Sequence, residues 1–300
     1  MAIVLGDNRY GKAETRLVRV VRDTARHEIR DLTVSSSLRG DFTAAHLDGD
    51  QANVLPTDTQ KNAVYAFAKD RGVGPPEEFA RELARHFVDD VAPVTSAQVV
   101  VAEHRWERAT VDGRPHDHTF VRSGSETRTA VVTAYDGGEH VLSGLTGLVL
   151  LKSTGSEFHG FLVDELTTLP PTHDRVLATS LTVRWRWAAV PSDGYDPAYE
   201  QVRALLVARF GSVHSLALQQ TLWEMGQGVL AARADIAEVR MSAPNKHHNL
   251  VDLSPFGLDN PGEVFVAADR PFGLIEVAVG RDEDEDEPAP EAWRDVPGFV

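Results

Sequence analysis

Residues 242–253 concentrate side chains that can take part in acid–base chemistry, since they read Ser-Ala-Pro-Asn-Lys-His-His-Asn-Leu-Val-Asp-Leu. Residues 250–253 alternate with a period of two, which predicts a β-strand. Pro244 and Asn245 are expected to end the element before it. We therefore expect residues 245–247 on a short loop at the mouth of a strand.

The adjacent histidines of this stretch, His247 and His248, allow three interpretations. As metal ligands they would rarely reach one ion, because neighbouring residues of a strand point to opposite faces. Alternatively, His247 is a proton shuttle, since imidazole titrates near neutral pH and Asn245 can orient a polar ligand. The third interpretation is a turn with solvated histidines, which the stretch taken alone favours.

Four further clusters carry groups that can bind or react. They are Tyr10-Gly11-Lys12, residues 56–62 with Thr57 and Asp58, residues 152–161 with Phe158, and Leu218-Gln219-Gln220-Thr221. Each also has a purely structural explanation. Thr57 and Asp58 suit a helix cap in any protein. Apolar members are by default core residues, and polar members are by default solvated.

Elements that position these residues are predicted from spacing. Two segments rich in β-branched residues predict strands, helical periodicity follows, and two more strands return. In order, the first half has strands at 14–23 and 28–39, helices from Thr57 to before Gly72 and from Pro75 to about residue 91, and strands at about 94–108 and 126–135. This order is ββααββ.

Asp136-Gly137-Gly138 is a turn signal, and the same order begins again after it. The second half has predicted strands at 140–152 and 176–190, helices at 196–210 and 214–232, and strands at 236–241, 250–253, 263–267 and 274–279. No clear repeat of individual residues accompanies this order. The predicted domains are therefore 1–138 and 139–280, followed by an acidic C-terminal tail at 281–300.

An α+β fold follows from this order, with two tandem domains that each place two helices on one face of an antiparallel sheet. Such sheets have edges that invite aggregation unless they are paired. Closing several sheets into a barrel between subunits would remove those edges. We therefore expect a homo-oligomer with sites at subunit contacts.

Composition excludes several classes of protein. The 300 residues include no cysteine, which excludes disulfides, thiolate metal sites and a cysteine nucleophile, and fits a reducing cytosol. A formal charge of −15 argues against binding to nucleic acid or to an anionic membrane. No segment approaches the ~20 apolar residues of a membrane span. We expect a soluble cytoplasmic protein, with the acidic run 282–287 and the following Pro-Ala-Pro solvated and mobile.

Taken together, the motifs resemble urate oxidase, the cofactor-free uricase family, over about residues 4–273. They are Tyr-Gly-Lys, Thr-Asp-x-x-Lys-Asn, Lys-Ser-Thr-x-Ser-x-Phe-x-Gly-Phe, Asp-Arg-Val-Leu-Ala-Thr and Pro-Asn-Lys-His. The resemblance implies two tunnelling-fold domains per chain and a homotetramer that encloses a tunnel. It also implies that urate, dioxygen and water give 5-hydroxyisourate and hydrogen peroxide in purine degradation, with no metal, flavin or haem.

Roles for individual residues come from the same resemblance. Lys12, Thr57 and His247 match the proton relay, in which a lysine of lowered pKa accepts protons and a hydroxyl passes them on. The matched substrate-binding residues are Asp58, Phe158, Leu169, Arg175, Leu218, Gln219 and Asn245. In the family, Thr57 and Asp58 come from the neighbouring subunit.

Within the substrate pocket, the resemblance implies that Arg175 and Gln219 grip the flat purine from opposite sides. A planar guanidinium suits this task better than an ammonium group. The ring of Phe158 would stack on the substrate, and Asn245 would lie by the site of dioxygen or water. As an alternative, Arg175 could pair with Asp174 at the surface, which would contribute little to stability.

Two other functions remain open. A pterin-type tunnelling-fold enzyme that uses zinc would need ligands such as His116 and His118, because cysteine is absent. A purine-binding protein without catalysis would not need the relay. The sequence departs from the family pattern at His159, where many relatives have a large aromatic residue, and at Pro170-Pro171, which stiffens the approach to Arg175.

Overall fold

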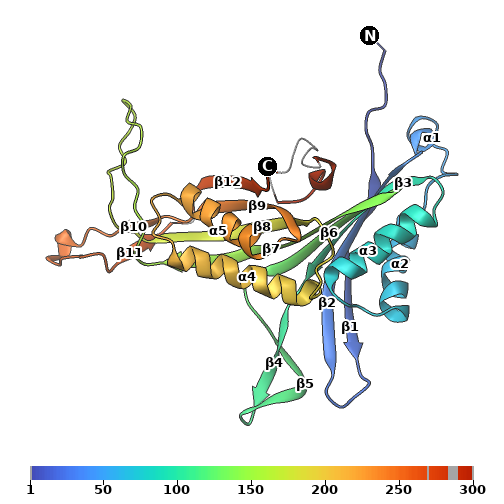
Figure 1. Ribbon diagram of the computed structural model, residues 1–300, viewed down its shortest axis with the longest axis horizontal. Coiled ribbons are helices and arrows are strands. Elements are labelled where there is room, and N and C mark those ends of the chain that lie inside the picture. The colour runs from blue at the N-terminus through green and yellow to red at the C-terminus, as the bar shows by residue number, and fades with distance from the viewer. Residues whose placement is uncertain (1, 269, 283–289, 299–300) are drawn as a thin grey trace. The chain divides into compact units, whose positions relative to one another are not determined.

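A computed structural model of the chain describes residues 2–268, 270–282 and 290–298 (Figure 1). These residues form two compact units. The first contains residues 2–144 and 290–296, and the second contains residues 145–268, 270–282 and 297–298. The predicted solvated segment at 282–290 lies almost entirely outside the described residues. The predicted domain limits stay predictions.

Eight strands form the main sheet, in the order β1-β2-β3-β6-β7-β8-β9-β12. Pairing is antiparallel between β1 and β2, β2 and β3, β3 and β6, β8 and β9, and β9 and β12. This arrangement leaves β1 and β12 at the two ends of the strand order. The expected α+β fold with antiparallel pairing is confirmed.

The first unit combines four complete strands of the sheet with two main helices (Figure 1). Helix α3 packs on β3 and β6, and α2 contacts β1. The reason is the stripe of Phe79, Leu83 and Phe87 at intervals of four residues, which is buried. Its elements are β1 (Tyr10–Val21), β2 (Glu28–Gly40), α1 (Thr43–Leu47), α2 (Thr57–Asp70), α3 (Pro76–Asp89), β3 (Val94–Glu103), β4 (Trp106–Val111), β5 (Arg114–Arg122), β6 (Thr127–Tyr135) and the first part of β7 (Gly138–Lys152).

The second unit has the same plan, with α5 packed on β9 and β12 and with α4 against α5. Trp185 and Leu206 are among its fully buried side chains. Its elements are the rest of β7, then β8 (Leu177–Trp187), α4 (Tyr195–Ser212), α5 (Leu218–Ala232), β9 (Ile236–Asn245), β10 (His248–Leu250), η1 (Ser254–Phe256), β11 (Phe265–Ala267) and β12 (Gly273–Gly280).

Near the C-terminus, the 3₁₀ turn η2 (Pro290–Trp293) is followed by residues that belong to the first unit. Val296 joins Val131 and Leu142 in a buried apolar cluster, and Trp293 packs against it. These residues therefore contribute to the core around β6 and β7.

Several strand limits differ from the predicted ones. β3 ends at Glu103, and the expected continuation to residue 108 instead starts the separate hairpin β4–β5. β9 continues through Pro244 to Asn245, because Asn245 pairs with Thr179 on one side and Gly273 on the other. The expected strand at 250–253 is instead β10, which ends at Leu250.

Helix α5 also begins later than predicted, at Leu218. The backbone of Ser215, just before it, is engaged elsewhere. The amide of Ser215 donates to the carbonyl of Gly155 at 2.9 Å, and the amide of Glu157 donates to the carbonyl of Ser215 at 2.7 Å. None of the described helices combines the length and apolar character required to cross a bilayer.

Candidate active site

Lys12 lies in β1 opposite Ser36 of β2, and its side chain is half-buried. The residue before it must be glycine because the two strands approach closely there. A Cβ atom on Gly11 would lie 1.8 Å from the carbonyl oxygen of Ser36. The glycine of the Tyr-Gly-Lys motif thus lets β1 bring Lys12 close to β2.

The start of β1 is tied to the segment before α2. The hydroxyl of Tyr10 donates to the carbonyl oxygen of Leu55 at 3.0 Å. A second tie comes from the buried Gln60 in the first turn of α2, which accepts a hydrogen bond from Ser36 at 2.7 Å. These bonds fix the strand that carries Lys12 relative to the start of the helix that carries Thr57.

Thr57 is the first residue of α2, and Pro56 occupies the cap position without a side-chain cap bond. Thr57 therefore does not occupy the cap position that one interpretation of the sequence gave it. Asp58 is exposed, pairs with Lys61 and accepts a hydrogen bond from Asn62 at 3.0 Å. Hydrogen bonding and charge from Lys61 lower the pKa of Asp58, with smaller contributions from Asn62 and the charge of Lys12. Lys12, Thr57 and Asp58 are thus brought into one region of the first unit.

A cavity of about 570 Å³ in the second unit gathers most of the other predicted residues. It is formed by the loop between β7 and β8, the end of β9 and the hairpin β10–β11. The predicted residues that line it are Phe158, Leu169, Arg175, Asn245 and His247. Five side chains separated by up to 89 positions in the sequence therefore share one cavity.

Within this cavity, the guanidinium carbon of Arg175 lies 5.1 Å from the centre of the Phe158 ring. The backbone amide of Arg175 donates to the carbonyl of Ser156 at 2.8 Å, and its Nε donates to the Ser156 hydroxyl at 3.3 Å. Burial lowers the pKa of Arg175, but an arginine remains charged at neutral pH. The cavity therefore offers a cation and an aromatic face side by side.

Residues that support Arg175 were not identified from the sequence. Asp174 accepts hydrogen bonds from the Thr154 hydroxyl at 2.9 Å and from the Gly155 amide at 3.1 Å. Asp174 thus connects the two ends of the loop between β7 and β8. The ion pair with Arg175 that the sequence suggested as an alternative is not the interaction made by these atoms. In the sequence, the Lys-Ser-Thr-x-Ser motif could have indicated these bonds, because it contains the hydroxyl groups of Thr154 and Ser156 that take part in them.

Asn245 and His247 reach the cavity from a well-supported backbone. Asn245 ends β9, the amide of Lys246 donates to Ala178 at 2.8 Å, and the amide of Ala268 donates to His247 at 2.9 Å. The side chain of His247 is exposed. An imidazole is thus available at the wall of the cavity, beside an amide that can orient a polar ligand.

Besides Lys12, Thr57 and Asp58, two predicted residues of the second unit do not line this cavity within the described chain. Leu218 and Gln219 form the first turn of α5, where Leu218 is buried and Gln219 is exposed. Their proposed contacts with substrate stay predictions.

The zinc alternative gains no support, because the group of three possible metal ligands found within the described chain includes neither His116 nor His118.

Two units built on antiparallel strands, and a cavity that places an arginine beside an aromatic ring, define a protein of the tunnelling-fold class. The uricase family model matches residues 8–133 and 141–276. The chain is 52% identical to uricase of Arthrobacter globiformis over 99% of this chain and 96% of that protein, and 37% identical to uricase of Aspergillus flavus over 91% and 95%. This chain therefore belongs to the uricase family, a family of oxidoreductases.

Solved structures agree with this assignment. The crystal structure of uricase from Arthrobacter globiformis matches with a TM-score of 0.92 at 52% identity, covering 97% of this chain and 100% of that chain. Urate oxidase from Bacillus sp. TB-90 matches with a TM-score of 0.81 at 23% identity, covering 91% and 100%. The second likeness concerns the fold alone.

Proposed function

We propose that this protein oxidises urate with dioxygen and water to 5-hydroxyisourate and hydrogen peroxide, in purine degradation and without a metal or organic cofactor. Urate gives up two electrons and dioxygen takes up two, so no further oxidant is needed. Water supplies the hydroxyl oxygen of the product. The observation that carries the proposal is the cavity that joins Phe158, Arg175, Asn245 and His247 in a member of the uricase family.

Substrate binding is assigned to the cation and ring at the cavity wall. Phe158 would stack on the flat purine, and the fork of Arg175 would bind its carbonyl edge. The hydrogen bond from Arg175 Nε to the Ser156 hydroxyl favours one orientation of the guanidinium. Leu169 would add apolar contact, while Leu218, Gln219 and Asp58 complete the proposed set of binding residues.

Proton transfer is assigned to Lys12, Thr57 and His247. A lysine and a hydroxyl at one side and an imidazole at the other can remove protons from urate and return them to the reduced oxygen. An electron-rich urate anion is the form that dioxygen oxidises directly. The protein's tasks in this scheme are positioning and charge stabilisation.

A complete site in this scheme requires a second copy of the chain. Thr57 and Asp58 are assigned to a neighbouring subunit, and Lys12 would accompany them because its charge acts on Asp58 within the same unit. The cavity with His247 would come from the other subunit. We propose a homotetramer with sites at the subunit interfaces and a cytoplasmic location.

Exposed apolar side chains support the oligomer. Leu162 and Leu166 in the loop after β7 are 93% and 82% exposed, and Phe256 between β10 and β11 is 75% exposed. On strands at the ends of the sheet order, Val18 of β1 and Leu274 of β12 are also exposed. Apolar residues on projecting loops and strand edges are typical of surfaces that a partner covers.

The decisive experiment follows urate by its ultraviolet absorbance, together with oxygen uptake and peroxide formation, on metal-stripped protein. Equal loss of urate and oxygen with matching peroxide is the expected result. Tight urate binding without turnover would instead identify a purine-binding protein. Turnover that depends on added metal would overturn the cofactor-free reaction.

A further inference from the structure

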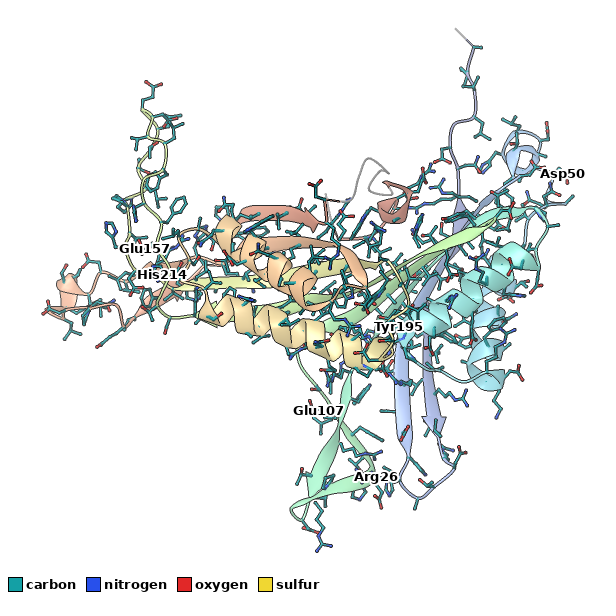
Figure 2. The ribbon with its side chains drawn as sticks, in the orientation of Figure 1. Arg26, Asp50, Glu107, Glu157, Tyr195 and His214 are labelled. Carbon is teal, nitrogen blue, oxygen red and sulfur yellow. The ribbon has the colours of Figure 1, made fainter. Side chains whose placement is uncertain are left out.

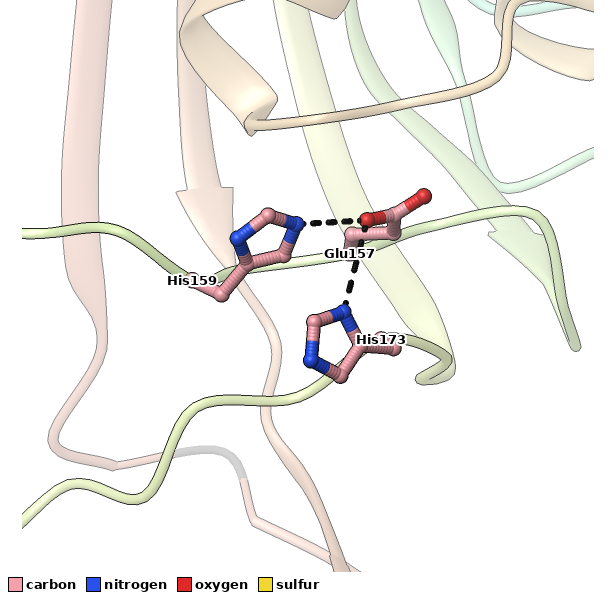
Figure 3. A group of neighbouring side chains, drawn as sticks. All are labelled: Glu157, His159 and His173. Atoms are coloured by element: carbon pink, nitrogen blue, oxygen red, sulfur yellow. Dashed lines mark hydrogen bonds and ion pairs between the residues drawn. The ribbon is translucent and has the colours of Figure 1, made fainter.

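One carboxylate and three imidazoles gather at the base of the loop after β7. Oε2 of Glu157 lies 2.8 Å from Nε2 of His159 and 3.9 Å from Nδ1 of His173 (Figure 3). The other carboxylate oxygen contacts Nε2 of His214, and Figure 2 shows Glu157 and His214 next to each other. Three nitrogen donors thus surround one carboxylate.

Backbone pairing explains why these side chains meet. Phe158 and Thr172 exchange two antiparallel hydrogen bonds, at 2.8 and 2.9 Å. In such a pair the flanking residues Glu157 and His173 lie opposite each other on one face. His159, two residues after Glu157, shares that face, whereas Phe158 points away from it. Accordingly, Phe158 lines the cavity and these three residues do not.

The carboxylate is held firmly, while the imidazoles reach solvent. Side-chain exposure is 18% for Glu157, 42% for His159 and 77% for His173. His159 and His214 contact the two oxygens of the Glu157 carboxylate and hold it in place. An anionic, pre-positioned ligand with accessible imidazoles can receive an ion directly from solution.

Hydrogen bonding alone accounts for only part of this arrangement. His159 and His214 are within bonding distance of the carboxylate, but His173 at 3.9 Å is too far for a hydrogen bond. Two ligand atoms of one ion lie only slightly closer together than this. A tetrahedral zinc ion with bonds of about 2.0–2.1 Å places its ligand atoms roughly 3.3 Å apart. All three ligand atoms lie within 4.8 Å of one another, so small side-chain rotations would close the site.

We propose that Glu157, His159 and His173 bind Zn²⁺ or a similar transition-metal ion, with His214 holding the second carboxylate oxygen. Imidazole nitrogen with one carboxylate favours such ions over Ca²⁺ and Mg²⁺, which prefer oxygen ligands. The ion takes no part in the proposed oxidation of urate. The ion would join residues 157–159 to residue 173, on the side of this segment that faces away from the cavity lined by Phe158.

Calorimetric titration with Zn²⁺ alone tests this site on the metal-stripped, full-length protein. Wild type should bind one ion per chain. His159→Gln and His173→Gln should each weaken binding by more than about tenfold, because even residues that only orient ligands change affinity by about 10–100-fold. His118→Gln is the matched control, since the exposed His118 lies in another histidine pair, 4.5 Å between ring centres, with His116.

Two further readouts make the test independent of turnover. Affinity should fall in acidic solution, since protons compete with the ion for its ligands. Zinc should raise the Tm of wild type but not of the His159→Gln/His173→Gln double variant. Absence of saturable binding to wild type, or equal binding by wild type and the double variant, would overturn the proposal whether or not urate is oxidised.

Discussion

The hydroxyl of Tyr10 donates a hydrogen bond to the carbonyl oxygen of Leu55 across 3.0 Å. This bond joins the first residue of β1 to the segment that leads into α2. The Tyr10 ring is held as well, by an edge contact with Phe42 at 4.7 Å between ring centres. Tyr10 therefore links the strand that carries Lys12 to the segment before Thr57, without belonging to the proposed relay.

Tyr10→Phe should keep the ring contact and lose only this bond. We expect the free energy of unfolding to fall by about 1 kcal/mol, as for a typical hydrogen bond. We also expect kcat to decrease with little change in KM, because Lys12 and Thr57 lose part of their mutual alignment. Urea unfolding and steady-state kinetics measure the two effects.

Tyr65→Phe is the matched control, since its hydroxyl donates to the backbone of Arg16 at 3.3 Å, between the same helix and strand but farther along both from Thr57 and Lys12. A comparable decrease of kcat in this control would show that Tyr10 has no special positioning role.

Local patterns in the sequence were sufficient for part of the fold. The stripe of Phe79, Leu83 and Phe87 predicts the buried face of α3 because helical spacing alone determines it. By contrast, the end of β9 depends on partners from two other strands, so Pro244 did not mark a boundary. Long-range pairing overrode the local signal there.

In the candidate site, too, local motifs could be predicted from the sequence whereas long-range contacts could not. Arg175 and Phe158 belong to contiguous motifs and were found from them, and the structure places both at one cavity. Ser156 and Asp174 were missed, since they act through hydrogen bonds to residues 19 and 20 positions away. Such partners cannot be predicted from local sequence, because the folding of the loop brings them together.

Separate roles are expected for relay and binding residues. Lys12→Met and His247→Ala should each lower kcat by about 10²–10⁴-fold, the usual contribution of general acid–base catalysis, with little change in urate affinity. Arg175→Ala should mainly weaken binding, by roughly 10- to 100-fold, since hydrogen bonds to charged groups contribute about 1.5–3 kcal/mol. Turnover rates and equilibrium binding of urate distinguish the two classes.

Lys69→Met, an exposed lysine of α2, is the control for charge removal and should change neither property. The division of roles would be wrong if Lys12→Met, His247→Ala and Arg175→Ala all reduced binding and turnover to the same extent.

Glu77 of α3 is fully buried and accepts hydrogen bonds from Arg128 of β6 at 2.8 Å and from Ser143 of β7 at 2.5 Å. Glu77→Ala would remove the nearer carboxylate of the buried Arg128 guanidinium, since Glu103 lies farther away, at 3.7 Å. We expect a loss of about 3–5 kcal/mol in the free energy of unfolding, as for other broken buried ion pairs. Glu78→Ala, at the exposed neighbouring position, should cost far less; equal losses would refute an anchoring role for Glu77.

Removal of metal separates the proposed reaction from the proposed ion site. Exhaustive chelation should leave urate turnover unchanged, because the relay of Lys12, Thr57 and His247 needs no Lewis acid. The same treatment should lower the Tm of protein purified with zinc, since ligand that binds only the folded state stabilises it. Activity that disappears on chelation and returns with zinc or iron would contradict the cofactor-free mechanism. If that response persisted in the His159→Gln/His173→Gln double variant, the required metal would have to lie outside the Glu157 cluster.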